Sequence, residues 1–333
     1  MEIGKISNEM LDSLILGRLK RHDARILTSA GIGEDCGVID FGENVCIVSS
    51  DPVTGASKRI GSIAVHVACN DIAASGVRPL AIVVTLLIPP DSSPADLETV
   101  IDDIVNTADA IKVSVIGGHT EVTDAVTRVV VSVTAIGIAG HGGYVSAKNA
   151  KAGDTVLMTK KAGLEGTAII AFELEDELKS VLYGDEIDEA KAFSGMVSVI
   201  EEGVAAHAAG AHAMHDITEG GVFGAAWEIA EAAGLGIEIY KENIPVADVT
   251  LKICEHYDVD PYRLISSGSM MIVTDAPEKV RKKLEESGVE CTVIGKMTGD
   301  PAKRYIKIHN KKSEKIEKLV SPEPDELYKV FNI

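Results

Sequence analysis

The fold of the first half of the chain depends on residues 68–79, which read Ala68-Cys-Asn-Asp-Ile-Ala-Ala-Ser-Gly-Val-Arg-Pro79. This Ala-rich composition predicts a helix over Ser62–Ser75, which ends at Gly76 and cannot continue through Pro79. Stretches rich in β-branched residues predict strands around it, at Val45–Ser50, Leu80–Ile88, Val113–Ile116 and Arg128–Ile138. A second helix is expected from Pro94, because Ser93 suits the N-cap and proline suits the first helical position. The first half is therefore expected to be a mixed α+β domain.

A second unit is predicted after the polar, glycine- and lysine-rich stretch Gly140–Gly153, which places the domain boundary between residues 148 and 149. Strands are expected at Thr155–Thr159, Ala211–His215, Ile237–Tyr240, Met270–Thr274, Cys291–Ile294 and Tyr305–Ile308. Helices are expected from Gly163, over Ala190–Ala209 and over Gly220–Ala233. Residues 1–148 and 149–333 are thus predicted to form two domains, each a sheet with helices on a face.

Composition restricts the classes of protein to consider. Of the 333 residues, 46% are hydrophobic and 25% are charged, which is typical of a globular chain of about two domains. The 32 basic and 51 acidic residues give a net charge of −19, so binding to nucleic acid is not expected. The N-terminus has no long apolar run, and the nearly uncharged stretch Pro79–Pro90 is too short to cross a bilayer. We therefore expect a cytoplasmic protein that does not insert into membranes, with its five cysteines reduced.

Acidic side chains recur inside glycine-rich turns or at the ends of predicted strands. They are Glu34 and Asp35 in Gly31-Ile-Gly-Glu-Asp-Cys-Gly37, Asp51, Asp71, Glu121 in Gly117-Gly-His-Thr-Glu121, and Asp216 in His215-Asp-Ile-Thr-Glu-Gly-Gly221. Carboxylate oxygens are the ligands that Mg²⁺ prefers, and glycines let backbone N–H groups approach phosphate oxygens closely. An aspartate beside a glycine is by itself more often a turn or a helix cap. The recurrence of the pattern nevertheless predicts a magnesium–nucleotide site.

The standard phosphate-binding motifs are absent. Gly-x-x-x-x-Gly-Lys-Ser/Thr occurs nowhere, and no Gly-x-Gly-x-x-Gly opens a helix after the first strand, which disfavours P-loop and dinucleotide folds. His207, His212 and His215 suggest a metal cluster, but Gly210 interrupts any shared helix, so surface histidines are the simpler interpretation. Only His215, beside Asp216, is expected near the site.

Five motifs, in the same order, resemble the aminoimidazole ribonucleotide (AIR) synthetase superfamily. They are Gly33-Glu-Asp-Cys-Gly-Val38, Ser49-Ser-Asp51, the stretch Ala68–Pro79 that contains the end of the first helix, Gly117-Gly-His-Thr-Glu121 and Asp216-Ile-Thr-Glu-Gly-Gly221. The resemblance spans about Gly31 to Ile294 and implies a two-domain, AIR synthase-like α+β fold. It implies an N-terminal α+β domain whose sheet pairs with that of a second subunit, a C-terminal α/β domain, and ATP with Mg²⁺ in the cleft between them.

The resemblance also implies roles for individual residues. The metal ligands that it implies are Asp35, Asp51, Asp71 and Asp216, and the catalytic residues are Asp71, Glu121 and Asp216. The nucleotide-binding residues that it implies are Gly33, Asn70, Gly117, Gly118, His119, Thr120, Gly220 and Gly221, of which the last two open a helix. The chemistry that it implies is phosphorylation by ATP of an oxygen on a second substrate. When that oxygen belongs to an amide, phosphorylation makes it a leaving group.

Among the branches of this superfamily, the chain looks most similar to the hydrogenase expression/formation protein HypE. The similarity rests on Asn70-Asp-Ile-Ala-Ala-Ser-Gly76, on the Asp216-x-Thr-x-Gly-Gly221 motif and on Glu121. It implies a homodimer, with hydrogenase-maturation proteins as partners. HypE dehydrates a carbamoyl group on its own C-terminal cysteine, whereas no cysteine follows Cys291 here. Either the acceptor is a free or foreign molecule, or the similarity reflects ancestry and not the reaction. Two alternatives stay open: a small-molecule kinase of the thiamine-monophosphate kinase type, and a non-catalytic nucleotide-binding partner in a maturation complex.

Overall fold

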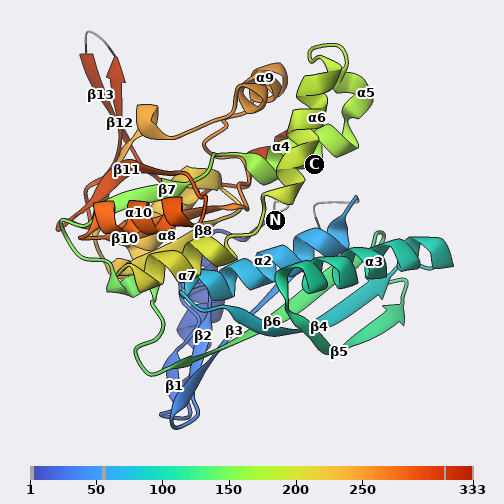
Figure 1. The fold of residues 1–333 in the computed structure, drawn as a ribbon, viewed down its shortest axis with the longest axis horizontal. Coiled ribbons are helices and arrows are strands. Elements are labelled where there is room, and N and C mark those ends of the chain that lie inside the picture. The colour runs from blue at the N-terminus through green and yellow to red at the C-terminus, as the bar shows by residue number, and fades with distance from the viewer. Residues whose placement is uncertain (1–3, 55–57, 311–312, 332–333) are drawn as a thin grey trace.

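The chain folds around two β-sheets, each covered by helices (Figure 1); the computed structural model describes residues 4–54, 58–310 and 313–331. The first sheet has the strand order β1 (Ile26–Thr28), β2 (Gly37–Asp40), β3 (Asn44–Val53), β6 (Val130–Gly140), β4 (Pro79–Ile88) and β5 (Ser114–Val122). Its neighbours are antiparallel except β4 and β5, which run parallel because helix α3 (Pro94–Ile111) connects them. Helix α2 (Ile60–Ala74) lies beside α3 on the same face.

The start of α3 shows how the sequence sets these elements locally. The Ser93 hydroxyl accepts a hydrogen bond from the backbone N–H of Asp96, and the Asp96 carboxylate accepts one from the backbone N–H of Ser93, at 3.3 and 2.8 Å. This reciprocal cap satisfies two N–H groups that a helix start otherwise leaves unpaired. The helix therefore begins at Pro94, as the sequence predicts.

The second sheet has seven strands in the order β13 (Ser313–Lys318), β12 (Arg304–Asn310), β9 (Gly236–Tyr240), β11 (Cys291–Thr298), β7 (Thr155–Thr159), β10 (Ser269–Thr274) and β8 (Ala213–Ile217). Its neighbours are antiparallel except β9 and β12. Helices α7 (Ile200–Ala208) and α10 (Pro277–Glu286) cover one face, and α8 (Gly221–Ala233) covers the other. Every residue of β10 is buried, with Met270 and Ile272 in one apolar cluster and Met271 and Val273 in another, as expected for a strand covered on both faces.

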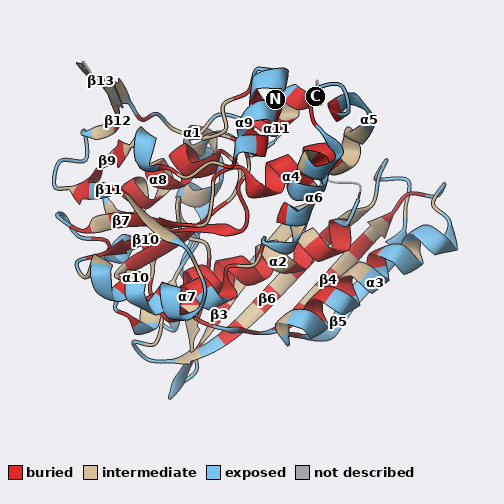
Figure 2. Cartoon of the chain, turned by 45° about the horizontal axis from the view of Figure 1, so that its top comes forward, coloured by how far each residue is buried: buried red, intermediate tan, exposed pale blue. Residues whose placement is uncertain are grey.

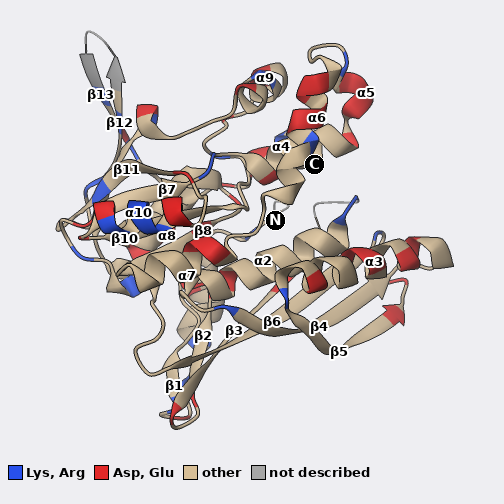
Figure 3. Cartoon of the chain, viewed as in Figure 1, with Lys and Arg blue, Asp and Glu red and all other residues tan. Residues whose placement is uncertain are grey.

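A smaller group of helices stands beside the second sheet. It consists of α4 (Leu164–Glu173), α5 (Glu175–Leu178), α6 (Gly184–Ala192) and α9 (Asp248–Tyr257), with the C-terminal helix α11 (Glu326–Val330). Acidic residues are dense on α5 and α6 (Figure 3). The N-terminal segment, with the short helix α1 (Asn8–Met10), ends up beside the C-terminal segment, because Asn8 Nδ2 donates to Ser321 Oγ at 3.3 Å. Figure 2 shows the two chain ends close together.

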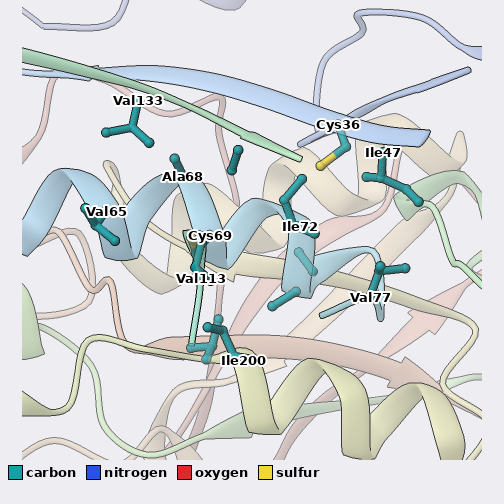
Figure 4. Close-up of a cluster of buried hydrophobic side chains, with 14 of the residues drawn as sticks. Cys36, Ile47, Val65, Ala68, Cys69, Ile72, Val77, Val113, Val133 and Ile200 are labelled. Atoms are coloured by element: carbon teal, nitrogen blue, oxygen red, sulfur yellow. The ribbon is translucent and has the colours of Figure 1, made fainter. Parts of the chain in front are cut away.

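Helix α2 joins the two halves of the molecule. It packs on β3 and β6 on one side and on α7 and β8 on the other. Figure 4 shows Ile72 of α2 among these neighbours, with Ile47 from β3 and Ile200 from α7 in the same buried cluster. Because this core is continuous, residues of α2 are held in place relative to both sheets. This includes Asp71, which lies on α2.

The two-sheet α+β architecture agrees with the sequence prediction, and two of the local differences bear on the site. The predicted helix over residues 190–209 is broken, because α6 ends at Ala192 and α7 begins at Ile200. The predicted strand at residues 113–116 continues to Val122, so that the predicted nucleotide loop at Gly117 is part of a strand. None of the helices in the described residues has both the length and the apolar composition needed to cross a membrane.

Candidate functional site

A pocket of about 680 Å³ lies where the two halves of the chain meet. Its walls come from the loop of residues 30–36, the second half of β3, one turn of α2, the end of β8 and the first half of α4. The N-terminal segment and α11 supply the remaining wall. The volume is that of an ordinary small-molecule site.

The structure brings all four aspartates that are predicted to bind metal to this pocket. Asp35 comes from the loop before β2 and Asp51 from β3, whereas Asp71 lies on α2 and Asp216 on β8. Asp71 and Asp216 are buried, at 7% and 1% exposure. The four residues are far apart in the sequence, so their convergence is a property of the tertiary fold.

His215 links these acids. Its Nδ1 lies 3.0 Å from Asp35 Oδ1 and 3.7 Å from Asp216 Oδ1, and its Nε2 lies 3.1 Å from Glu228 Oε2. Burial alone would lower the pKa of His215, but the three carboxylates outweigh burial and raise this pKa well above its usual value. The imidazole is therefore a cation that holds the carboxylates together. His215 lies in the pocket beside Asp216, where the sequence places it, on a strand that is buried along its whole length.

Asp71 lies in a second cluster of oxygens. Its Oδ2 accepts a hydrogen bond from Ser49 Oγ at 2.5 Å, and its backbone carbonyl accepts one from Cys36 Sγ at 3.2 Å. Burial raises the pKa of the Asp71 carboxyl well above its usual value, and the charges of Asp216 and Asp51 raise it further. Burial likewise raises the pKa of Asp35, to about 6, although His215 offsets part of the effect. Such crowding of carboxylates is unfavourable unless a cation relieves it.

The donor set fits Mg²⁺. Carboxylate oxygens of Asp35 and Asp216 lie within 4.8 Å of each other, with the His215 imidazole beside them as a counter-charge and not as a metal ligand. Asp216 Oδ2 is buried and has no hydrogen-bond partner among the described residues, which is costly for a carboxylate oxygen in a protein interior. A hard cation with oxygen ligands would satisfy this oxygen and the crowded acids beside it.

Three of the predicted nucleotide-binding glycines lie at or next to the pocket. Gly33 lines it, and a Cβ at Gly33 would come within 2.4 Å of the Glu228 carbonyl oxygen. Gly220 and Gly221 open α8, as predicted, with φ angles of +82° and +60°. A Cβ at Gly221 would lie 2.6 Å from the Tyr262 carbonyl oxygen. The close approach that these glycines permit is therefore an approach to neighbouring backbone, and their contact with a nucleotide stays a prediction.

The other predicted loop is placed differently. Gly117, Gly118, His119, Thr120 and Glu121 belong to β5, the exposed edge strand of the first sheet, and none of them lines the pocket. Gly118 pairs with Val84 of β4, and a Cβ there would lie 2.0 Å from the Val84 carbonyl oxygen, so strand packing accounts for the glycine. His119 Nε2 lies 3.4 Å from Glu121 Oε2, at the surface. A single chain therefore does not bring the predicted catalytic Glu121 to Asp71 and Asp216.

Asn70 also differs from the expectation. Its Nδ2 donates to the Val197 carbonyl at 2.7 Å, and its Oδ1 accepts from the Val199 N–H at 2.9 Å. The side chain is fully buried and does not line the pocket. Asn70 therefore connects α2 to the segment before α7, and this connection helps to break the predicted helix there.

Sequence reasoning missed several residues that line the pocket: Lys5, Glu165, Glu228, Ser267 and Asp325. Glu165 is the single charged residue in the run Ala162–Phe172, and a lone charge in an apolar helix could have marked it. No comparable signal marked Lys5. Only the fold brings it close enough to Glu219, Glu228 and Asp216 for their negative charges to act on its ammonium group.

Solved structures share this architecture. The HypE of a HypE–HypF complex aligns over 93% of this chain and 99% of its own, with a TM-score of 0.75 and 22% identity. A hydrogenase maturation protein HypE in complex with ATP aligns over 98% of this chain and 97% of its own, with a TM-score of 0.69 and 19% identity. At such identities, the likeness establishes the fold.

Relatives in sequence are hydrogenase-maturation proteins by name. A protein of Methanocaldococcus jannaschii that is assigned to hydrogenase expression/formation is 30% identical over 314 residues, covering 89% of this chain and 88% of its own. The carbamoyl dehydratase HypE of Bradyrhizobium diazoefficiens is 28% identical over 253 residues, covering 74% of this chain and 71% of its own. The chain is thus HypE-like in sequence as well as in fold.

Both halves of the chain match the same protein family. The N-terminal domain of AIR synthase related proteins matches residues 33–139, and the C-terminal domain matches residues 151–307. These two segments contain all four aspartates that are predicted to bind metal. The chain therefore belongs to the AIR synthase related protein family.

Proposed function

We propose that the chain is an ATP- and Mg²⁺-dependent enzyme of the HypE type, which phosphorylates an oxygen of an amide-like acceptor during hydrogenase maturation. The observation that carries the proposal is the convergence of Asp35, Asp51, Asp71 and Asp216 on one pocket, with an oxygen of Asp216 that has no partner among the residues the structure describes. The names of the relatives, among them a carbamoyl dehydratase, and the ATP complex of a HypE with this fold support it.

The charged residues of the pocket would have different roles in binding MgATP. The four aspartates would hold Mg²⁺ next to the triphosphate, and bound Mg²⁺ would neutralise charge on the phosphoryl oxygens. His215 keeps Asp35 and Asp216 together through its 3.0 and 3.7 Å contacts. Lys5 brings a positive charge to the same pocket, where it would face the phosphates.

Binding of the ATP analogue AMPPNP tests the first part of the proposal. Calorimetry with Mg²⁺ is expected to show binding to the wild type, and Asp71→Asn is expected to weaken it at least about tenfold, because one anionic metal ligand is lost. Asp102→Asn is the matched control, since Asp102 is exposed on α3. Equal affinity of the wild type and Asp71→Asn would show that the aspartate cluster does not serve the nucleotide.

Single-turnover release of phosphate from ATP tests the reaction. A peptide with an S-carbamoyl cysteine is the acceptor to try first, and thiamine monophosphate is the alternative. Phosphate release that depends on the carbamoyl peptide supports the proposal. Phosphorylation of thiamine monophosphate would instead indicate a small-molecule kinase, and binding of ATP without consumption would indicate a non-catalytic partner.

We also propose that the working form is a homodimer joined through the first sheet. All nine residues of its edge strand β5 are exposed, including the apolar Val115, Ile116 and Val122. An exposed apolar edge strand favours association with another chain. Light scattering is expected to give the mass of a dimer for the wild type and of a monomer for Ile116→Glu. Val181→Glu, at another exposed apolar residue, is the control, and a monomeric wild type would refute the proposal.

A further inference from the structure

The end of the pocket at α4 and α11 has a character of its own. Glu165 and Ile169 of α4, Ser267 of the loop before β10, and Leu327 and Tyr328 of α11 line it. This end contains none of the four aspartates assigned above to the metal. Ile169, Leu327 and the Tyr328 ring make it largely apolar, and its polar groups are the Glu165 carboxylate and the Ser267 and Tyr328 hydroxyls. The Tyr328 hydroxyl already donates to Glu219 Oε1, at 3.1 Å.

Two polar groups at this end have no partner beyond each other. Glu165 is 3% exposed and Ser267 is 1% exposed, and the two interact with each other, yet neither Glu165 Oε2 nor Ser267 Oγ has a hydrogen bond of normal geometry within the part of the chain described. Buried polar atoms are nearly always hydrogen-bonded, because leaving one unpaired costs free energy. Two such atoms on the wall of one pocket indicate that a ligand completes them.

The backbone around the pair is held rigidly. Gly163 N–H donates to Ser266 Oγ at 2.6 Å, and Gly166 N–H donates to the Ile265 carbonyl at 3.0 Å, which fastens the start of α4 to the loop. A Cβ at Gly166 would lie 2.5 Å from Leu264 Cγ, so the two segments are in close contact. The pair therefore cannot easily move to find other partners, as expected of a preorganised binding site.

The charge near the pair indicates which ligand it suits. The charged groups that act on Glu165 are the carboxylates of Asp325 and Glu219. Asp325 accepts backbone N–H groups of Gly220, Leu327 and Ile265 at 2.7, 2.8 and 3.1 Å, so it contributes a negative field but has no free oxygen to offer. A ligand group that donates hydrogen bonds and carries a positive charge is favoured here.

Basic residues on the far side of Glu165 are engaged elsewhere. Lys58 and Arg59 line a small adjoining pocket that shares Glu165 as a wall. Lys58 Nζ donates to the Phe172 carbonyl at 2.6 Å, and Arg59 is hydrogen-bonded to Ser194 Oγ. Neither is paired with Glu165 in the described part of the chain, so the acid remains available to a ligand.

We propose that Glu165 and Ser267 form a subsite that binds a protonated amino group of the second substrate. The inference rests on the proposed function, since it assigns this end of the pocket to the acceptor and the other end to MgATP. An ammonium group offers three N–H donors, one for the Glu165 carboxylate and one for the Ser267 hydroxyl oxygen. The acceptor class is thereby narrowed to molecules that carry a primary amine beside the group to be phosphorylated.

Propylammonium is the probe, and its binding is measured by NMR titration in the presence of Mg²⁺ and AMPPNP, which occupy the aspartate end. The wild type is expected to bind at least about tenfold more tightly than Glu165→Gln and about threefold more tightly than Ser267→Ala. Glu189→Gln, which changes an exposed glutamate, should bind like the wild type. Propionamide, similar in size but neutral, should bind at least about tenfold more weakly than propylammonium.

Two results would overturn the inference: equal affinity of propylammonium for the wild type and Glu165→Gln, or propionamide binding as tightly as propylammonium. A failure of the proposed function gives a different result: AMPPNP does not bind the wild type in the calorimetric assay. The propylammonium titrations can then be repeated without nucleotide, and they still test the Glu165 subsite.

Discussion

Replacing Glu165 by glutamine is expected to stabilise the free protein at alkaline pH. Burial raises the pKa of Glu165 from 4.5 to about 7; hydrogen bonding to Ser267 offsets part of this effect, and the charges of Asp325 and Glu219 add to it. Because the folded state binds this proton more tightly than the unfolded chain does, the wild type loses stability as the pH rises from about 4.5 to 7. Above pH 7 the loss is complete. Glutamine has the same shape and never ionises.

The size of the effect follows from the pKa values. A difference of about 2.5 pH units corresponds to about 3 kcal/mol of unfolding free energy at pH 8, and to less than about 1 kcal/mol at pH 5. The entropy of unfolding of a chain of this length is about 0.7 kcal/mol per degree. The melting temperature of Glu165→Gln should therefore exceed that of the wild type by about 4 °C at pH 8 and by about 1 °C at pH 5.

Calorimetric melting of both proteins between pH 5 and pH 8, without nucleotide or Mg²⁺, measures the difference. Glu189→Gln makes the same chemical change at an exposed position and should leave the melting temperature unchanged at every pH. A Glu165→Gln protein that melts below the wild type at pH 8 would show that the carboxylate has a stabilising partner. A gain of the same size at all pH values would show that its ionisation is not the cause.

Three further predictions concern other parts of the structure. Mg²⁺ should raise the melting temperature of the wild type. Without Mg²⁺, Asp71→Asn should melt at a higher temperature than the wild type, because it removes one of the crowded carboxylates, and adding Mg²⁺ should change its melting temperature little. If Mg²⁺ stabilises the variant as much as the wild type, Asp71 does not bind the metal. Gly118→Ala should lower the free energy of unfolding, measured in urea, by about 2 kcal/mol or more, because its Cβ would lie 2.0 Å from the Val84 carbonyl oxygen. Gly117→Ala is the control and should be tolerated, since no described atom lies within 4 Å of its Cβ. Equal effects of the two substitutions would refute the packing argument. Asp325→Ala should cost about 3 kcal/mol in the same assay, since three backbone N–H groups would lose their acceptor, and a neutral result would mean that water replaces it.

Local features could be predicted from the sequence because they depend on near neighbours. The strand at Thr155–Thr159 and the helix that begins at Pro94 follow from residue type, periodicity and capping within a few positions. The broken helix before Ile200 could not be predicted in this way. The Asn70 side chain, 127 residues away from Val197 in the sequence, hydrogen-bonds to the Val197 carbonyl and the Val199 N–H. A continuous helix would need both of these backbone groups for its own hydrogen bonds.

The sequence by itself determined the residue types of the site and their local setting: aspartates placed beside glycines or at the ends of buried elements, in an order that resembles one family. Only the tertiary structure decided which of them meet. Asp35, Asp51, Asp71 and Asp216 converge because α2 packs against both sheets, whereas Glu121 does not join them because β5 is the exposed edge of its sheet. The burial of Glu165 beside Ser267 arises in the same way. Burial and electrostatic environment arise from contacts between distant segments, and no short stretch of sequence encodes them.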